Sequence, residues 1–219
     1  MRIPVLQRKP AATDWRVVHQ VASWCLSYPD DQLLELLPTL RAALDEQPDS
    51  EPVALLAGVV DTLLTTSPDD LRHSYVDVFD LSRKHTLYLT YWTDGDTRRR
   101  GEALAAVKQL YRDSGFVTDL RGELPDHLPI VLEFCARADP EGGVAFLGRY
   151  RTALEQIGRA LRERGSGYAD VLTALTLTLP EAPDTFAPAP AQIPVETVGL
   201  EPYDPRLLPL NPVAGPARR

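Results

Sequence analysis

The sequence has few of the features that mark several large classes of protein. Its 219 residues include only two cysteines, Cys25 and Cys135, and no C-x-x-C pair, which argues against a disulfide framework or a thiolate metal site and is typical of a reducing compartment. No apolar run reaches the roughly 18 residues that cross a membrane, and the first ten residues lack the apolar core of a signal peptide. We therefore expect a cytoplasmic protein without stable membrane insertion.

Positive charge is also in short supply. The chain has 23 Lys and Arg against 31 Asp and Glu, a net charge of -8. Nucleic acids and anionic membranes attract basic surfaces, so this balance argues against both as general partners. The expected partner is neutral or cationic.

Enzyme motifs are missing as well. The nucleophile elbow, the Walker loop, the dinucleotide fingerprint and H-E-x-x-H do not occur. His73 and Asp77 are four residues apart and could share a helix face, with Asp80 beyond, but two ligands do not make a metal site. We expect no enzyme, no cofactor and no metal, and keep a helical metal-dependent hydrolase using His73 and Asp77 as the alternative.

The sequence does contain the residues that typically start and end helices. Apolar residues recur at three- and four-residue spacing between capping residues, which predicts an all-α, single-domain helical bundle over residues 13–180. Thr13 is the predicted cap of the first helix, Asp30 or Asp31 starts the second, and Pro38 is expected to bend or split it. Ser50, Ser67-Pro68, the segment 96–114 and Asp139-Pro140 mark later helices, with Gly115 and Gly165 as stops.

The last part of the chain is read differently. Residues 168–179 contain several threonines, which suit a strand, but a single strand would have no partner in a helical domain, so we predict the last helix there. Residues 181–219 are rich in proline and are expected to be extended or disordered, and residues 1–12 form an N-terminal extension.

The segment Glu123-Leu124-Pro125-Asp126-His127-Leu128-Pro129 is the most distinctive. Its prolines and Asp126 predict a capped helix start, with an exposed histidine in the simplest interpretation. His127, which titrates near neutral pH, is not needed for a cap and makes a binding role the competing interpretation.

A second unusual segment is Tyr75-Val76-Asp77-Val78-Phe79-Asp80. Helical spacing puts Tyr75 and Phe79 on one face and Asp77 and Asp80 on another. This pattern fits either a core face beside a solvated face or a groove with apolar walls and an acidic rim, suited to a peptide with Arg or Lys. For the following Arg98-Arg99-Arg100 we expect intramolecular ion pairs.

The order of these motifs resembles NarJ-type chaperones, within the wider group of TorD- and DmsD-like maturation chaperones. The likeness covers roughly Trp15 to Leu179 and is carried by Tyr75 to Asp80, Arg83, Gly95 to Gly101, Glu123 to Pro129 and Leu132-Glu133-Phe134. One departure is Trp92-Thr93-Asp94, where many members have His or another polar residue, so no role in that turn is transferred.

The resemblance implies a TorD/DmsD/NarJ-type helical fold and no catalytic turnover. It implies binding to the N-terminal peptide of the catalytic (alpha) subunit of respiratory nitrate reductase, so that the molybdenum cofactor can be inserted. Molybdenum cofactor biosynthesis proteins are further candidate partners. The implied client-binding residues are Tyr75, Phe79, Asp80, Arg83, Glu123, Pro125, Asp126 and His127. A general helical adaptor protein, which would bind folded partners, remains an alternative.

Overall fold

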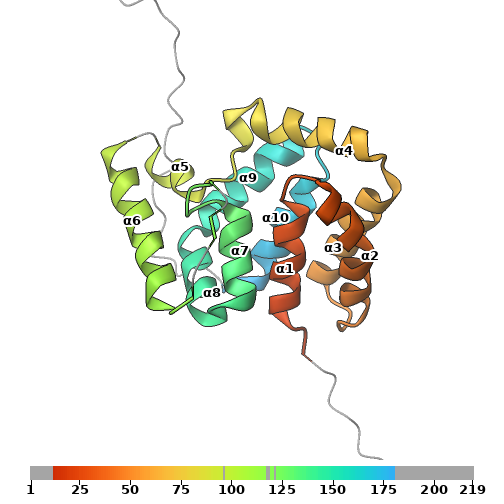
Figure 1. The fold of residues 1–219 in the computed structure, drawn as a ribbon, viewed down its shortest axis with the longest axis horizontal. Coiled ribbons are helices and arrows are strands. Elements are labelled where there is room, and N and C mark those ends of the chain that lie inside the picture. The colour runs from red at the N-terminus through yellow and green to blue at the C-terminus, as the bar shows by residue number, and fades with distance from the viewer. Residues whose placement is uncertain (1–11, 96, 117–118, 121, 181–219) are drawn as a thin grey trace, which may run out of the picture.

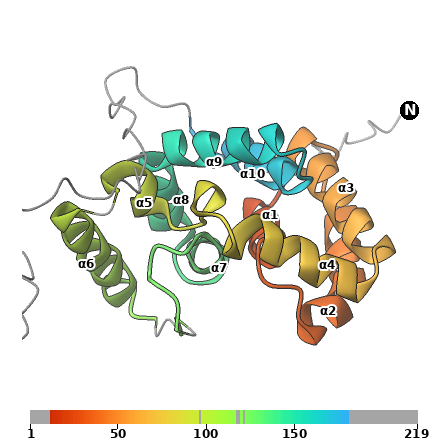
Figure 2. The same ribbon diagram turned by 90° about the horizontal axis from the view of Figure 1, so that it is seen from above.

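A computed structural model describes residues 12–95, 97–116, 119–120 and 122–180 of the chain. The predicted extension and Pro-rich tail thus lie almost wholly outside the described residues. Within these ranges the chain is helical, and no strand is formed beyond one isolated β-bridge. The bundle is elongated, with α6 at one end and α2 and α3 at the other (Figures 1 and 2). The helices are α1 (Trp15–Cys25), α2 (Asp31–Asp45), α3 (Glu51–Thr65), α4 (Pro68–Tyr75), α5 (Leu89–Asp94), α6 (Arg98–Asp113), α7 (Leu128–Arg137), α8 (Pro140–Arg149), α9 (Arg151–Glu163) and α10 (Tyr168–Thr178).

Two short elements follow α4. The π-helix η1 (Val76–Asp80) continues α4 directly, and the 3-10 helix η2 (Arg83–His85) comes after it. At the end of η1, the amide of Leu81 donates to the carbonyl of Val76 at 3.0 Å, the five-residue bond of a π-helix. Short π-helical turns are frequent at functional sites. This one presents part of the predicted binding segment.

The core lies where α1, α7 and α10 meet in the middle of the bundle. α1 packs chiefly on α7, and α10 packs on both α3 and α9. Fully buried side chains from four helices, including Leu56, Leu132, Ile157 and Leu172, fill this space. Their burial is the main favourable contribution to folding.

Helix starts follow the predicted capping chemistry with some corrections. Asp14, rather than Thr13, caps α1 by accepting from the amide of Arg16 at 3.0 Å. Asp30 caps α2. Ser50 occupies the predicted N-cap position of α3, but its side chain makes no cap bond. Local patterns therefore place the helix starts to within a residue, while the bonding depends on surroundings.

Pro38 was predicted to bend or split the second helix, and the split does not occur. α2 runs without a break from Asp31 to Asp45, with Pro38 exposed on its outer side. A proline inside a helix costs about 3 kcal/mol. Apolar residues on both sides of it share one buried face, and continuing the helix keeps that face intact. These residues are Leu33, Leu37, Leu40 and Leu44.

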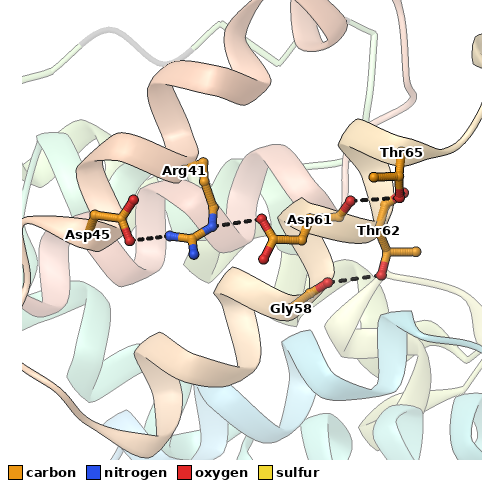
Figure 3. A network of polar contacts seen from close by, with 6 residues as sticks. All are labelled: Arg41, Asp45, Gly58, Asp61, Thr62 and Thr65. Carbon is orange, nitrogen blue, oxygen red and sulfur yellow. Dashed lines mark hydrogen bonds and ion pairs between the residues drawn. The ribbon is translucent and has the colours of Figure 1, made fainter.

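A polar network joins α2 to α3 on the outside of the bundle (Figure 3). Arg41 lies between Asp45 on its own helix and Asp61 on α3, and its Nε is 2.7 Å from the Asp61 carboxylate. The pairs are solvent-exposed, so they orient the two helices more than they stabilise them.

The element predicted from Asp139 to Gly165 is two helices. Asp139 caps α8 through the amide of Gly142 at 2.9 Å, as expected, but the chain turns at Tyr150 and α9 starts at once. Gly165 ends α9 with a φ of 75°. This left-handed conformation favours glycine and confirms the predicted stop.

Candidate functional site

An antiparallel β-bridge brings the two predicted binding segments together. The amide of Leu89 donates to the carbonyl of Asp126 at 3.2 Å, and the amide of Leu128 donates to the carbonyl of Leu87 at 2.9 Å. Tyr88 and His127 are the bridged residues. The chain that leaves η1 is thereby fastened to the start of α7, some forty residues later in the sequence.

A cleft of about 420 Å³ lies beside this bridge. It is formed by the C-terminal end of α1, the π-helix η1, the bridge segment and the first turns of α7. Its aromatic lining is Trp24, Tyr28, Tyr75, Phe79 and Tyr88, and its carboxylates are Asp30, Asp80, Asp119, Glu123 and Glu133. No Lys or Arg belongs to the described lining, so the charge of the cleft is strongly negative.

The aromatic wall is held in place from behind. The ring of Tyr75 lies 4.8 Å from that of Phe79 and 5.5 Å from that of Tyr28, and its hydroxyl donates to the buried carbonyl of Leu26 at 3.0 Å. Phe79 also packs at 5.0 Å on Tyr168 of α10. Tyr75 is itself buried, whereas Phe79 is half-buried and Tyr28 is exposed. The latter two rings are therefore available for contact with a ligand.

The opposite side of the cleft carries a cluster of three polar side chains in contact. The hydroxyl of Tyr88 donates to the carboxylate of Glu123, and its ring lies 5.2 Å from the ring of His127. Burial and the Glu123 bond raise the pKa of Tyr88, so it remains a donor. Burial lowers the pKa of His127, although Glu123 and Asp126 partly oppose the shift. His127 is therefore neutral at pH 7 and can accept or donate a hydrogen bond.

Asp126 is not the cap of α7. His127 occupies that position, without a side-chain bond, and Asp126 is completely buried. Its Oδ2 accepts from the amide of Thr90 at 2.9 Å and from the Thr90 hydroxyl at 2.6 Å, so it caps the first turn of α5 from a distant part of the chain. The prediction of a local cap is wrong because Oδ2 of Asp126 is bonded to Thr90, far away in the sequence, and the buried Oδ1 accepts no hydrogen bond from the described residues.

Pro125 is buried too, and its carbonyl accepts from the hydroxyl of Tyr111 at 2.7 Å. Arg83 is exposed on η2 and does not line the cleft. Of the eight residues predicted to bind a client, the structure brings Tyr75, Phe79, Asp80, Glu123 and His127 into one cleft. Pro125 and Asp126 lie behind it and support the bridge.

Sequence reasoning missed Trp24 and Tyr28. They lie near the end of α1, about fifty residues before Tyr75, and only the packing of α1 on α7 and of the Tyr28 ring on Tyr75 places them in the cleft. The available sequence signal was an aromatic residue in the predicted turn Ser27-Tyr28-Pro29-Asp30, whereas the 45% exposure of its ring is known only from the structure.

The arginine run also behaves differently from expectation. Arg100 donates from Nε to the hydroxyl of Thr90 at 3.2 Å, and its guanidinium lies 5.9 Å from the ring centre of Tyr88 and 5.7 Å from that of Tyr91. These are cation–π contacts. Arg100 thus supports Thr90, and through it Asp126, from the side of α6.

His73 and Asp77, the residues of the alternative metal-site prediction, interact with other groups. Asp77 pairs with Arg164, and the Nδ1 of His73 is 2.9 Å from the carbonyl of Asp69. Across the described ranges, no three His, Cys, Asp or Glu side chains gather in a way that could hold a metal ion. The same part of the chain holds no helix that combines the length and hydrophobicity needed to cross a membrane.

Comparison with known proteins gives consistent matches. The family model described as nitrate reductase delta subunit matches residues 31–174. The nitrate reductase-like protein NarX of Mycobacterium tuberculosis is 43% identical over 165 residues, which are 75% of this chain but only 24% of NarX. The chain thus spans about a quarter of that relative.

Two further comparisons cover most of both partners. The probable nitrate reductase molybdenum cofactor assembly chaperone NarJ of Bacillus subtilis is 33% identical over 76% of this chain and 90% of its own length. A crystal structure of a putative redox enzyme maturation protein from Archaeoglobus fulgidus superposes with a TM-score of 0.59, covering 78% of this chain and 97% of that one. At 22% identity the latter match shows the fold alone.

Proposed function

This chain belongs to the nitrate reductase delta subunit family, and on that premise we propose that it is a NarJ-type chaperone for assembly of a respiratory nitrate reductase. In this role it binds the N-terminal region of the catalytic subunit in the cytoplasm and assists molybdenum cofactor insertion. It performs no catalytic turnover, and molybdenum cofactor biosynthesis proteins are further partners in the proposal.

The observation that carries the proposal is the acidic, aromatic cleft between α1, η1 and α7. A cleft of about 420 Å³ has room for a few side chains, within the usual range of ligand pockets. Aromatic rings offer contact area to apolar side chains, and carboxylates pair with Arg or Lys. The chemistry matches a short segment that alternates apolar and basic residues.

The rim extends this preference. Leu81 directly follows Asp80 and is 76% exposed, and Leu124 directly follows Glu123 and is 40% exposed. Each of these exposed leucines is therefore the sequence neighbour of a carboxylate that lines the cleft. A bound peptide with basic residues at the carboxylates would meet apolar surface on either side, which favours an amphipathic segment over a merely basic one.

Such a site suits binding followed by release. A segment that becomes ordered on binding loses conformational entropy, which offsets part of the contact energy. Charge contacts at an exposed rim speed association and weaken with salt. The complex is thus expected to be specific but reversible, as delivery of an enzyme subunit to its next assembly step requires.

Calorimetry tests the proposal with a synthetic peptide that covers the N-terminal segment of the catalytic subunit. We expect saturable binding that weakens several-fold from low to high salt. Asp80→Asn should weaken it and reduce the salt effect, because Asp80 is an exposed carboxylate of the cleft. Phe79→Ala should weaken it with the salt effect unchanged.

The matched control is Asp49→Asn, which removes the same charge from the exposed loop between α2 and α3. α2 begins at the cleft with its cap Asp30 and extends away from it for about 22 Å, so Asp49 lies far from the site. Absence of peptide binding, or equal losses for Asp80→Asn and Asp49→Asn, would overturn the proposed site.

A further inference from the structure

The N-terminal segment, residues 1–11, has the chemistry that the acidic cleft selects. It reads Met-Arg-Ile-Pro-Val-Leu-Gln-Arg-Lys-Pro-Ala, with three basic residues and no acidic one, although the whole chain has a net charge of -8. Apolar residues, including Ile3, Val5 and Leu6, lie between Arg2 and the pair Arg8-Lys9. We propose that this segment docks in the cleft of its own chain and competes there with the client.

The surface of α1 provides a route. Val17, Gln20 and Trp24 follow one another at helical spacing on one face of α1, and all three are half-buried, as is Thr13 just before the helix. This accessible stripe starts where the segment joins the helix and ends at Trp24, which lines the cleft. Val17 and Trp24 pack partly against the core, and the remainder of each apolar side chain is accessible along this route.

The distances permit docking within one chain. From the cap Asp14 to Trp24 the helix rises about 15 Å, and an extended segment covers about 3.3 Å per residue. Six residues before Ala12 therefore span about 20 Å. Residues 1–6, which include Arg2, Ile3 and Leu6, can then reach the cleft, while Arg8 and Lys9 lie along the approach to it.

Because the N-terminal segment is covalently joined to the bundle, weak contacts with the cleft are enough for docking. A short flexible connection gives an effective concentration on the order of millimolar. If the segment binds the cleft with a dissociation constant of about 0.1 mM, the cleft is free about one tenth of the time, and the client binds about tenfold more weakly than it would to an empty cleft. A client of higher affinity still displaces the segment. The docking therefore raises selectivity and protects the aromatic wall when no client is present.

A paramagnetic label tests the docking without any client. In full-length protein, Ile3→Cys is labelled with a nitroxide. Burial raises the pKa of both Cys25 and Cys135 to about 12, so the native thiols do not compete for the label at neutral pH. We expect amide signals of Tyr28, Asp80 and Glu123 to broaden at low salt and to recover at high salt. The matched control is a label at Ala217→Cys in the C-terminal segment, which should leave these signals sharp.

Two variants give the functional readout. Removing all three N-terminal charges by Arg2→Gln, Arg8→Gln and Lys9→Gln should abolish the broadening and strengthen client-peptide binding several-fold. Arg218→Gln with Arg219→Gln removes basic charge from the other end of the chain and should change neither quantity.

The regulatory meaning of the docking rests on the proposed function, but the label measurement does not. Broadening in a protein that binds no client peptide would support the docking and refute the proposed client site. Client binding without broadening at low salt would refute the docking alone. Broadening seen only between labelled and unlabelled copies in a mixture would identify a second copy as the occupant and overturn docking within one chain.

Discussion

Replacing Asp126 with alanine is expected to lower the free energy of unfolding by about 3 to 5 kcal/mol. The buried carboxylate accepts two hydrogen bonds, from the Thr90 amide at 2.9 Å and the Thr90 hydroxyl at 2.6 Å. Hydrogen bonds to a charged group contribute about 1.5 to 3 kcal/mol each, and the substitution leaves two buried donors without their acceptor. For a chain of this size the loss corresponds to a fall in Tm of roughly 10 °C.

Urea and thermal unfolding of the parent, Asp126→Ala, Thr90→Val and the double variant measure this effect. Because the two residues are in direct contact, their coupling energy should be about 1 to 3 kcal/mol. His127→Ala is the neighbouring control. His127 is half-buried at the edge of the cleft, so its substitution should lower stability by less than about 1 kcal/mol while weakening client-peptide binding.

A loss of about 1 kcal/mol or less for Asp126→Ala would refute this reasoning. That value is typical of an ordinary N-cap, and it would mean that Thr90 finds other acceptors when the carboxylate is removed. Additive effects of Asp126→Ala and Thr90→Val would lead to the same conclusion, since uncoupled residues do not share a bond that matters.

Three other outcomes are expected. Burial lowers the pKa of His19 from 6.5 to about 4, so as the pH falls the unfolded chain takes up a proton on His19 before the folded protein does. The free energy of unfolding should therefore fall by up to about 3 kcal/mol between pH 6.5 and pH 4. His19→Leu should flatten that part of the stability curve measured by urea unfolding. Gly143→Ala should destabilise the protein by a few kcal/mol, because the added Cβ would lie 2.4 Å from the Cys135 sulfur and 2.8 Å from the Cys135 Cα. The control Gly148→Ala in the same helix places its Cβ within 4 Å of no atom outside its own stretch of helix and should stabilise the protein by up to about 1 kcal/mol. Similar Tm shifts for the two variants would contradict the packing argument. Truncation after Pro183 should leave the Tm nearly unchanged, because a complete helical set precedes it, and a loss of several degrees would show that the tail packs on the bundle.

Much of the helical structure could be predicted because its causes are local. Ser67 followed by Pro68 opens α4, Asp139 caps α8 through a residue three positions away, and Gly115 follows α6 with a φ of 75°. Each of these depends on bonds or backbone preferences within about one turn, which sequence neighbours largely determine. The threonine-containing α10 was predicted correctly against its strand propensity because a lone strand has no partner for its backbone groups.

Local rules failed where distant residues competed. Pro38 should interrupt α2, yet the buried leucines on both sides outweigh its cost. Asp126 should cap the helix that it precedes, yet its Oδ2 accepts hydrogen bonds from both the amide and the hydroxyl of Thr90, 36 residues earlier in the chain. In both cases the local preference is worth a few kcal/mol at most, and tertiary burial or hydrogen bonding exceeds it.

The sequence by itself determined the all-helical class, the position of most helices and several of the aromatic and acidic residues that line the cleft, because periodicity, capping and charge are properties of nearby residues. Only the tertiary structure decided which of those residues meet. The bridge between Tyr88 and His127 joins segments that no local rule connects, and it turns two separate motifs into one cleft. The packing of the helices also places Trp24 of α1 and the nearby Tyr28 in the cleft and buries Asp126, since burial and long-range hydrogen bonds depend on how the helices pack.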